Sequence, residues 1–129
     1  MLKRGMSTRD EGNRAEAIAA YWLTTMGYEI LRRNYQKPWG EIDIIASKDG
    51  EIVFFEVKAN TKEGDNFDPE FRIDHRKLYK IVKTATLYLE FENRNLDKPW
   101  RVDAISVIFN EFLGTAKMKH FKNIAESHF

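Results

Sequence analysis

A predicted β-hairpin, GEIDIIASKDGEIVFFEVK at residues 40–58, constrains the fold of this chain more than any other segment. Asp49-Gly50 is a strong signal for a two-residue turn. A turn there pairs the two apolar runs with each other, whereas a slip of one residue would place apolar side chains opposite charged ones. The facing pairs are Lys48–Glu51, Ser47–Ile52, Ala46–Val53, Ile45–Phe54, Ile44–Phe55 and Ile42–Val57. The hairpin therefore predicts a β-sheet at the centre of the fold.

The same register places carboxylates inside this apolar hairpin, with Asp43 opposite Glu56 and Glu41 opposite Lys58. Directly opposed residues have Cβ atoms roughly 4.5–5.5 Å apart. Two carboxylates at that distance repel unless one takes a proton or a cation lies between them. Mg²⁺ prefers oxygen ligands and often binds one or two carboxylates plus water. Two interpretations follow: a metal site with Lys58 on the same strand face, or solvated carboxylates on an open sheet face beside an ordinary Glu41–Lys58 ion pair.

Helical and extended patterns place further elements on both sides of the hairpin. Apolar residues recur at helical spacing after residue 10 and again after Asp74, which can cap a helix. The order α-β-β-β-α-β-(β) predicts an α/β fold with a single mixed sheet flanked by helices. The expected elements besides the hairpin are a helix at 11–26 stopped by Gly27, a strand at 28–35, a helix after Asp74, a strand at 100–109 and a short strand at 117–124.

The length of 129 residues suits one domain better than two. We expect a loose polar lead-in at residues 1–10 and a single domain at 11–129. The absence of cysteine excludes disulfides and thiolate metal sites. No apolar run has membrane-spanning length and the first residues lack a signal-peptide pattern, so a cytoplasmic location is expected. Because the net charge is only +1, nucleic-acid binding would need a local basic patch.

The carboxylate pattern also resembles a known family. GEIDII followed by VFFEVK has the spacing D-x12-E-x-K, which resembles the PD-(D/E)xK nuclease superfamily, and the whole chain is similar to the YraN-like family of bacterial proteins. The superfamily's leading proline is Ile42 here, as in the branch that is similar to Holliday-junction resolvases. Asn60 stands where the family often has an arginine, which weakens one expected phosphate contact. The matching pieces lie in order along the chain: GNRAEAIAAYWL, ILRRNY, the hairpin, Lys77 and RVDAISV.

The resemblance implies a restriction-endonuclease-like α-β-β-β-α-β core with a metal-dependent catalytic site. Asp43, Glu56 and the carbonyl of Val57 would hold Mg²⁺, or Mn²⁺ in vitro. Glu16 would act as a further ligand or as a base that positions water. Lys58 would orient the attacking water or stabilise charge that develops on the phosphorane.

Basic side chains on the second helix suggest where a nucleic acid could bind. Arg76, Lys80 and Lys83 follow helical spacing, and Lys77 matches a lysine of the family. A basic stripe can contact a phosphate backbone, although it can equally be an ordinary solvated helix face. The residues expected at phosphates are Arg33, Lys77 and Lys80, with Arg32 and Arg72 as further candidates. Trp39 is the tryptophan placed to stack on an unpaired base, and the polar loop 61–69 follows Lys58 directly.

The leading hypothesis is therefore a Mg²⁺-dependent endonuclease that hydrolyses DNA phosphodiester bonds, with branched DNA as a candidate substrate. The alternative is a catalytically silent nucleic-acid-binding or protein-interaction module that keeps the nuclease fold. A third class, a phosphoesterase acting on nucleotides, would use the same residues. We expect DNA and no membrane as partner, with a homodimer through the exposed last strand as an open prediction.

Overall fold

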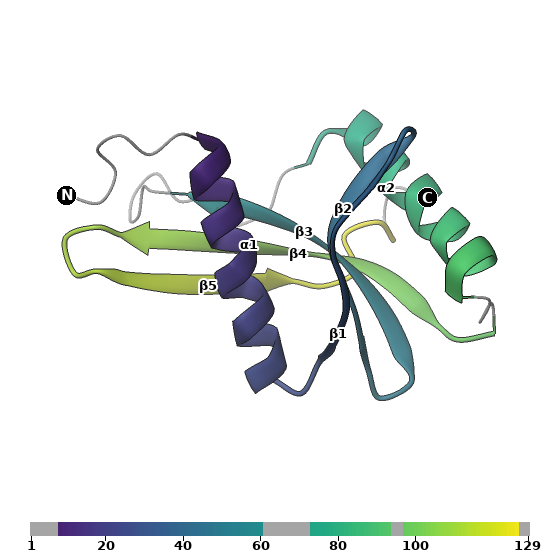
Figure 1. Cartoon of the computed structure of the whole chain (residues 1–129), viewed down its shortest axis with the longest axis horizontal. Helices are drawn as coiled ribbons and strands as arrows, with labels where there is room; N and C mark the ends of the chain where they lie inside the picture. Colours follow the sequence, from purple (N-terminus) through teal and green to yellow (C-terminus); the bar gives the residue numbers. More distant parts are fainter. Residues whose placement is uncertain (1–7, 61–72, 94–96, 127–129) are drawn as a thin grey trace.

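The chain forms one mixed five-stranded sheet with a helix on each side (Figure 1), described by a computed structural model for residues 8–60, 73–93 and 97–126. The strand order is β1-β2-β3-β4-β5, in which β3 and β4 are parallel and all other neighbours are antiparallel. This arrangement confirms the predicted α/β class. The elements are α1 (Thr8–Thr25), β1 (Glu29–Lys37), β2 (Gly40–Lys48), β3 (Glu51–Asn60), α2 (His75–Tyr88), η2 (Leu89–Asn93), β4 (Trp100–Asn110) and β5 (Thr115–Phe121).

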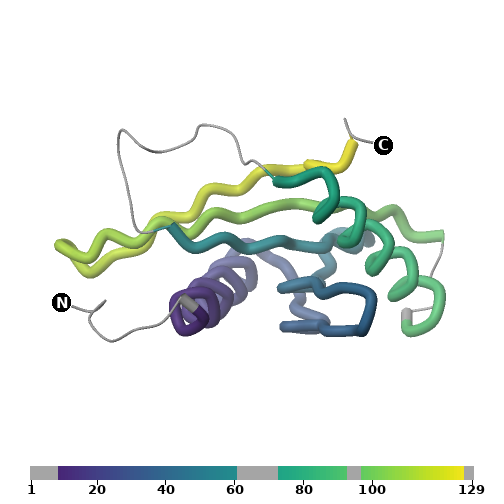
Figure 2. Tube along the Cα trace, turned by 90° about the horizontal axis from the view of Figure 1, so that it is seen from above, coloured from purple at the N-terminus to yellow at the C-terminus, as the bar shows by residue number. Residues whose placement is uncertain are grey.

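Two hydrophobic cores lie on opposite faces of the sheet because side chains alternate along each strand. On β3, Phe55 packs in the core under α1, and its neighbour Phe54 packs in the core under α2. Figure 2 shows α1 lying along one side of β3, β4 and β5. Both faces of the central strands are therefore covered, which explains their nearly continuous apolar sequences.

The turn of the central hairpin confirms the predicted register. Asp49 and Gly50 both have positive φ angles, 53° and 80°, as a type I′ turn requires. The ladder between β2 and β3 then runs from Lys48–Glu51 to Ile44–Phe55. Among these described strand residues, the expected pairs beyond that point, Asp43–Glu56, Ile42–Val57 and Glu41–Lys58, are not part of the ladder. The two strands separate at the carboxylates.

Several element boundaries differ from the sequence prediction. Helix α1 begins at Thr8 and ends at Thr25, so Met26 is exposed instead of packing in the helical stripe. Strand β1 extends to Lys37, and β5 lies at Thr115–Phe121. Asp74 caps α2 as predicted, because its carboxylate accepts a hydrogen bond from the backbone N–H of Arg76. The loop at 61–69 and Arg72 lie outside the described residues.

No helix in the described part of the chain combines the length and the apolar character needed to cross a membrane. The cytoplasmic location and the homodimer stay predictions.

Candidate active site

The β1–β2 hairpin changes direction where it meets the carboxylates. A bulge between Ile30 and Arg32 shifts the register of β1, and Asn34 adopts a left-handed φ of 54°, which asparagine tolerates. On β2, Ile44 packs in the core under α1, whereas Ile42 packs in the core under α2. Strict alternation would place both on one face. The strand therefore turns over at the residue between them, Asp43, and β1 and β2 cross the long parts of β3 to β5 steeply (Figure 1).

Asp43 takes over a hydrogen bond that the ladder no longer provides. Its Oδ2 atom accepts a hydrogen bond of 2.7 Å from the backbone N–H of Val57 on β3. This contact satisfies a backbone donor at the point where the strands separate. It also fixes the carboxyl group in the opening between β2 and β3, where side chains from both faces of the sheet can meet.

Glu16 reaches this opening from the α1 side. It shares the inward face of α1 with Ala19, Ala20 and Leu23, at helical spacings of three, four and seven residues. The small alanines let the helix lie close to the sheet, and Glu16 is buried there. Its carboxyl group shares a hydrogen bond with Asp43.

Glu56 reaches the opening from the α2 side. Its Oε2 atom lies 2.6 Å from Nζ of Lys77 on α2, and Glu56 itself is buried. Lys77 was expected to contact a phosphate; in this structure it neutralises part of the charge of Glu56. Arg33 makes a longer contact on the other side, with Nη2 3.9 Å from Oε1 of Glu16. The three carboxyl groups thus have two partly exposed cations beside them.

The pKa values of all three carboxyl groups are raised, mainly by burial, although cations lie beside the cluster. Burial is the main cause that raises the pKa of Asp43 to about 7, with a further increase from the nearby Glu16, although the Val57 N–H opposes it. Burial and the charge of Asp43 raise the pKa of Glu56 to about 7 against the effect of Lys77. Burial also raises the pKa of Glu16. Such a group of carboxylates favours a bound proton or a bound cation.

The remaining expected site residues lie around this cluster. Lys58 is exposed two positions beyond Glu56 on β3, so it shares that strand face. Lys80 is exposed on α2, one turn after Lys77. Val57 directs its N–H to the β2 side, and in an extended strand the N–H and C=O of one residue point to the same side. The structure brings Glu16, Asp43 and Glu56 together, with Val57 and Lys77 in contact.

The donor set fits Mg²⁺ by its chemistry. Two carboxylates and a backbone carbonyl are hard oxygen ligands, and Mg²⁺ usually completes its shell with water instead of an all-protein cage. Within the described ranges, no group of three or more acidic or histidine side chains is arranged so that it could hold a metal ion by itself. Asp43, Glu56 and the Val57 carbonyl are the groups that could hold the ion.

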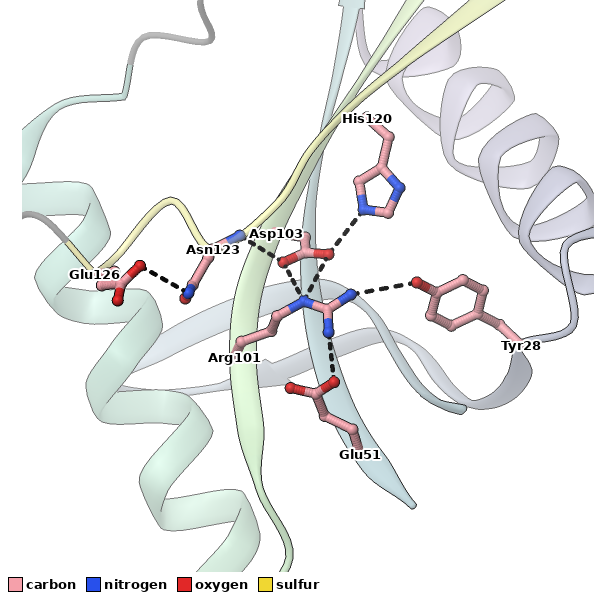
Figure 3. A network of polar contacts seen from close by, with 7 residues as sticks. All are labelled: Tyr28, Glu51, Arg101, Asp103, His120, Asn123 and Glu126. Carbon is pink, nitrogen blue, oxygen red and sulfur yellow. Dashed lines mark hydrogen bonds and ion pairs between the residues drawn. The ribbon is translucent and has the colours of Figure 1, made fainter. Parts of the chain in front are cut away.

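A second buried polar cluster escaped the sequence analysis (Figure 3). Asp103 on β4 is fully buried on the α1 side of the sheet, and its carboxylate accepts hydrogen bonds from Arg101 Nε at 2.9 and 3.1 Å and from the Asn123 N–H at 2.8 Å. His120 Nε2 lies 2.7 Å from Oδ2 of Asp103. Arg101 also contacts Glu51 and the Tyr28 hydroxyl. The sequence signal was RVD within an apolar strand: two opposite charges two residues apart share one face and need partners there.

Comparison with known proteins places the chain in a family. The family model described as "Uncharacterised protein family UPF0102" matches residues 15–107. The chain belongs to this family, which confirms the YraN-like part of the resemblance. The match covers Glu16, the hairpin carboxylates and most of β4.

Individual relatives carry the same family name. The chain is 42% identical over 110 residues to a UPF0102 protein of Fervidobacterium nodosum, covering 85% of this chain and 77% of the relative. It is 43% identical over 98 residues to a UPF0102 protein of Wolinella succinogenes, covering 76% and 85%. It is 41% identical over 104 residues to a UPF0102 protein of Helicobacter pylori, covering 81% and 86%. These names state no activity.

Among solved structures, the chain is similar to that of Pyrococcus furiosus SfsA in complex with Ca²⁺, with a TM-score of 0.41 and 13% sequence identity. The similarity covers 90% of this chain and 64% of SfsA. A likeness of that degree establishes neither an activity nor a ligand for this chain.

Proposed function

We propose that the chain is a metal-dependent endonuclease that hydrolyses DNA phosphodiester bonds, with branched DNA as the substrate class to test first. One observation carries the proposal. Glu16, Asp43 and Glu56 come from three different elements and meet in the opening between β2 and β3, with pKa values raised by burial and by one another. Buried, strongly perturbed carboxylates that converge on an opening are typical of catalytic sites. The resemblance to PD-(D/E)xK nucleases supports the same assignment.

Each residue then has a role in hydrolysis. The reaction forms a bond from a water oxygen to phosphorus and breaks one P–O ester bond; the water loses a proton and the leaving oxygen gains one. Mg²⁺, held by Asp43, Glu56 and the Val57 carbonyl, would supply Lewis-acid stabilisation of phosphoryl oxygens and lower the pKa of water. Glu16 accepts the proton from the attacking water, for which its raised pKa is suited. Lys58 and Lys77 stabilise negative charge on the phosphoryl group.

One contact favours the second candidate, a silent nucleic-acid-binding module. Lys77 already lies 2.6 Å from Glu56 and can substitute for part of the charge of a metal ion. In a silent module this lysine would be the permanent partner of Glu56. In an enzyme it would move to the substrate phosphate when Mg²⁺ binds. The two candidates therefore differ in whether divalent ions compete with Lys77.

The test is cleavage of labelled linear duplex, single-stranded and four-way-junction DNA with Mg²⁺ or Mn²⁺. We expect metal-dependent cutting by the wild type and a loss of roughly 100-fold or more in Asp43→Ala and in Glu56→Ala, as for removal of a main catalytic group. Asp49→Asn is the matched control, because it removes an exposed acid while asparagine is well suited to the turn. Equal rates in wild type and both alanine variants would show a contaminating nuclease and end the proposal.

A further inference from the structure

A cavity of about 590 Å³ lies next to the carboxylate cluster, between the β1–β2 turn and the first two turns of α2. Trp39 lines one wall, and Arg76, Lys77 and Lys80 line the other. Lys77 connects the cavity with the cluster, because its Nζ atom contacts Glu56. The volume is in the range of pockets for small ligands, such as one nucleotide.

The wall that carries Trp39 is firmly attached to α2. At Gly40, a Cβ atom would lie only 2.3 Å from Oγ1 of Thr84, so the backbone of the turn lies directly against the helix. Thr84 in turn donates a hydrogen bond of 2.7 Å to the carbonyl of Lys80. The backbone next to Trp39 therefore packs against the buried Thr84 side chain and lies close to the carbonyl of Lys80 on α2.

The lining groups suit a nucleotide. The charged side chains that line the cavity are four cations, Lys37 among them, and two acids, Glu41 and Asp74. Lys37 is engaged with Glu92 at 3.3 Å, and Asp74 caps α2. Arg76 and Lys80 are exposed on the α2 wall, and Trp39 keeps 42% of its surface exposed although it is a large apolar side chain. An exposed aromatic ring beside cations is the usual platform for an unpaired base and its phosphates.

We infer that this cavity binds one unpaired nucleotide directly beside the phosphodiester that is cut, with the base stacked on Trp39 and its phosphates at Arg76 and Lys80. A base within a duplex is stacked on both sides and cannot reach a ring on the wall of such a cavity. The substrate class is therefore DNA with a single-stranded segment at the cut, as at a flap, a gap or an open junction. This assignment rests on the proposed nuclease function, because it takes the bound nucleotide to be the neighbour of the scissile phosphate.

Binding in EDTA tests the cavity without any cleavage. Anisotropy of a labelled oligothymidylate and of a labelled duplex would be measured for the wild type and for Trp39→Ala, Trp39→Phe and Lys80→Gln. Loss of one base–aromatic stack should weaken single-strand binding by roughly 5-fold to 100-fold in Trp39→Ala, while Trp39→Phe keeps most of the affinity. Duplex binding should change less than about 2-fold in both Trp39 variants.

Lys80→Gln, which leaves the indole in place, should weaken single-strand binding and reduce its salt dependence by about one phosphate contact. Phe112→Ala is the matched control, since Phe112 is an exposed aromatic on the β4–β5 turn, away from the cavity.

Tryptophan fluorescence gives an independent readout. Oligothymidylate should quench wild-type emission, and Trp39→Phe should remove that quenching although Trp22 and Trp100 remain. The inference is wrong if Trp39→Ala binds single strands like the wild type, if it loses duplex binding equally, or if free dTMP binds as tightly as the oligonucleotide. Cleavage that is unaffected by Trp39→Ala would overturn the cavity assignment and leave the proposed nuclease function in place. Binding that depends on Trp39, without any cleavage, would support the cavity as a nucleotide site and overturn the nuclease function.

Discussion

Asp43 and Asp103 lie in the same sheet, and both are held by protein hydrogen bonds, but their surroundings act on them in opposite directions. Burial raises the pKa of Asp103 too, yet contacts from His120, Arg101 and the Asn123 N–H outweigh it, and the pKa lies below the ordinary value. Around Asp43, the Val57 N–H opposes burial and the nearby carboxylates of Glu16 and Glu41, and the pKa rises to about 7. The charge of Asp103 is compensated within the protein, whereas that of Asp43 is not.

This difference indicates which cluster stabilises the fold and which is prepared for a ligand. The groups around Asp103 connect β3, β4 and β5 with Tyr28, which directly precedes β1, and they satisfy each other (Figure 3). Such a network leaves little negative charge for an external cation. The cluster of Glu16, Asp43 and Glu56 keeps a deficit of positive charge that a divalent ion would remove. Buried carboxyl groups alone therefore do not mark a site; incomplete compensation does.

The largest effect should come from breaking the compensated cluster. Asp103→Asn removes the anion beside Arg101, whose side chain is only 18% exposed, and leaves a buried cation with fewer partners. We expect the free energy of unfolding to fall by about 3 kcal/mol or more. Urea denaturation measures this loss. A loss below about 1 kcal/mol would show that Asp103 is not the centre of this network.

Neutral substitutions at Asp43 and Glu56 should have the opposite effect and raise the free energy of unfolding. The folded protein keeps protons on Asp43 and Glu56 up to about pH 7, while the unfolded chain loses them near their ordinary pKa values of 3.8 and 4.5. Without metal, the free energy of unfolding should therefore decrease as pH rises from about 4 to 7 and level off above that. Asp43→Asn with Glu56→Gln should remove this slope and stabilise the apo protein by ~2 kcal/mol at about pH 8.

Denaturation curves of wild type and double variant across this pH range measure the effect, with Asp49→Asn as the control for loss of an exposed carboxylate. Parallel pH profiles for all three proteins would contradict the charge deficit.

A smaller effect is expected at Lys77, which supplies part of the missing positive charge. Lys77→Gln should destabilise the protein by ~0.5 kcal/mol at about pH 8, because its side chain is 55% exposed and solvent screens the pair. The effect should vanish at about pH 5, where Glu56 is protonated. Lys83→Gln, exposed on the same helix, is the matched control. An equal loss at both pH values would mean that Lys77 acts through packing.

The sequence predicted the fold because its signals are local. The Asp49-Gly50 turn set the hairpin register, Asp74 marked the start of α2, and alternating apolar residues marked the strands. The end of the ladder at Ile44–Phe55 was not predictable, because it goes with the bulge and the left-handed Asn34 in a different strand, β1.

The candidate site was predicted in part for the same reason. Asp43 and Glu56 follow from the hairpin alone, and Glu16 came from the family resemblance. The contact of Lys77 with Glu56 and the partners of Asp103 join residues far apart in the sequence. Charge alone does not say which distant groups will meet.

The most direct test of the charge deficit is a calorimetric titration of Mg²⁺ and Mn²⁺ into the wild type, the Asp43→Asn/Glu56→Gln variant and the Asp49→Asn control at about pH 7. The account predicts saturable binding to the wild type and the control, with release of protons from the cluster that shows as a dependence on buffer ionisation heat. The double variant should show no such binding. Identical weak heats in all three proteins would contradict the account and favour the silent module, in which Lys77 is the permanent partner of Glu56.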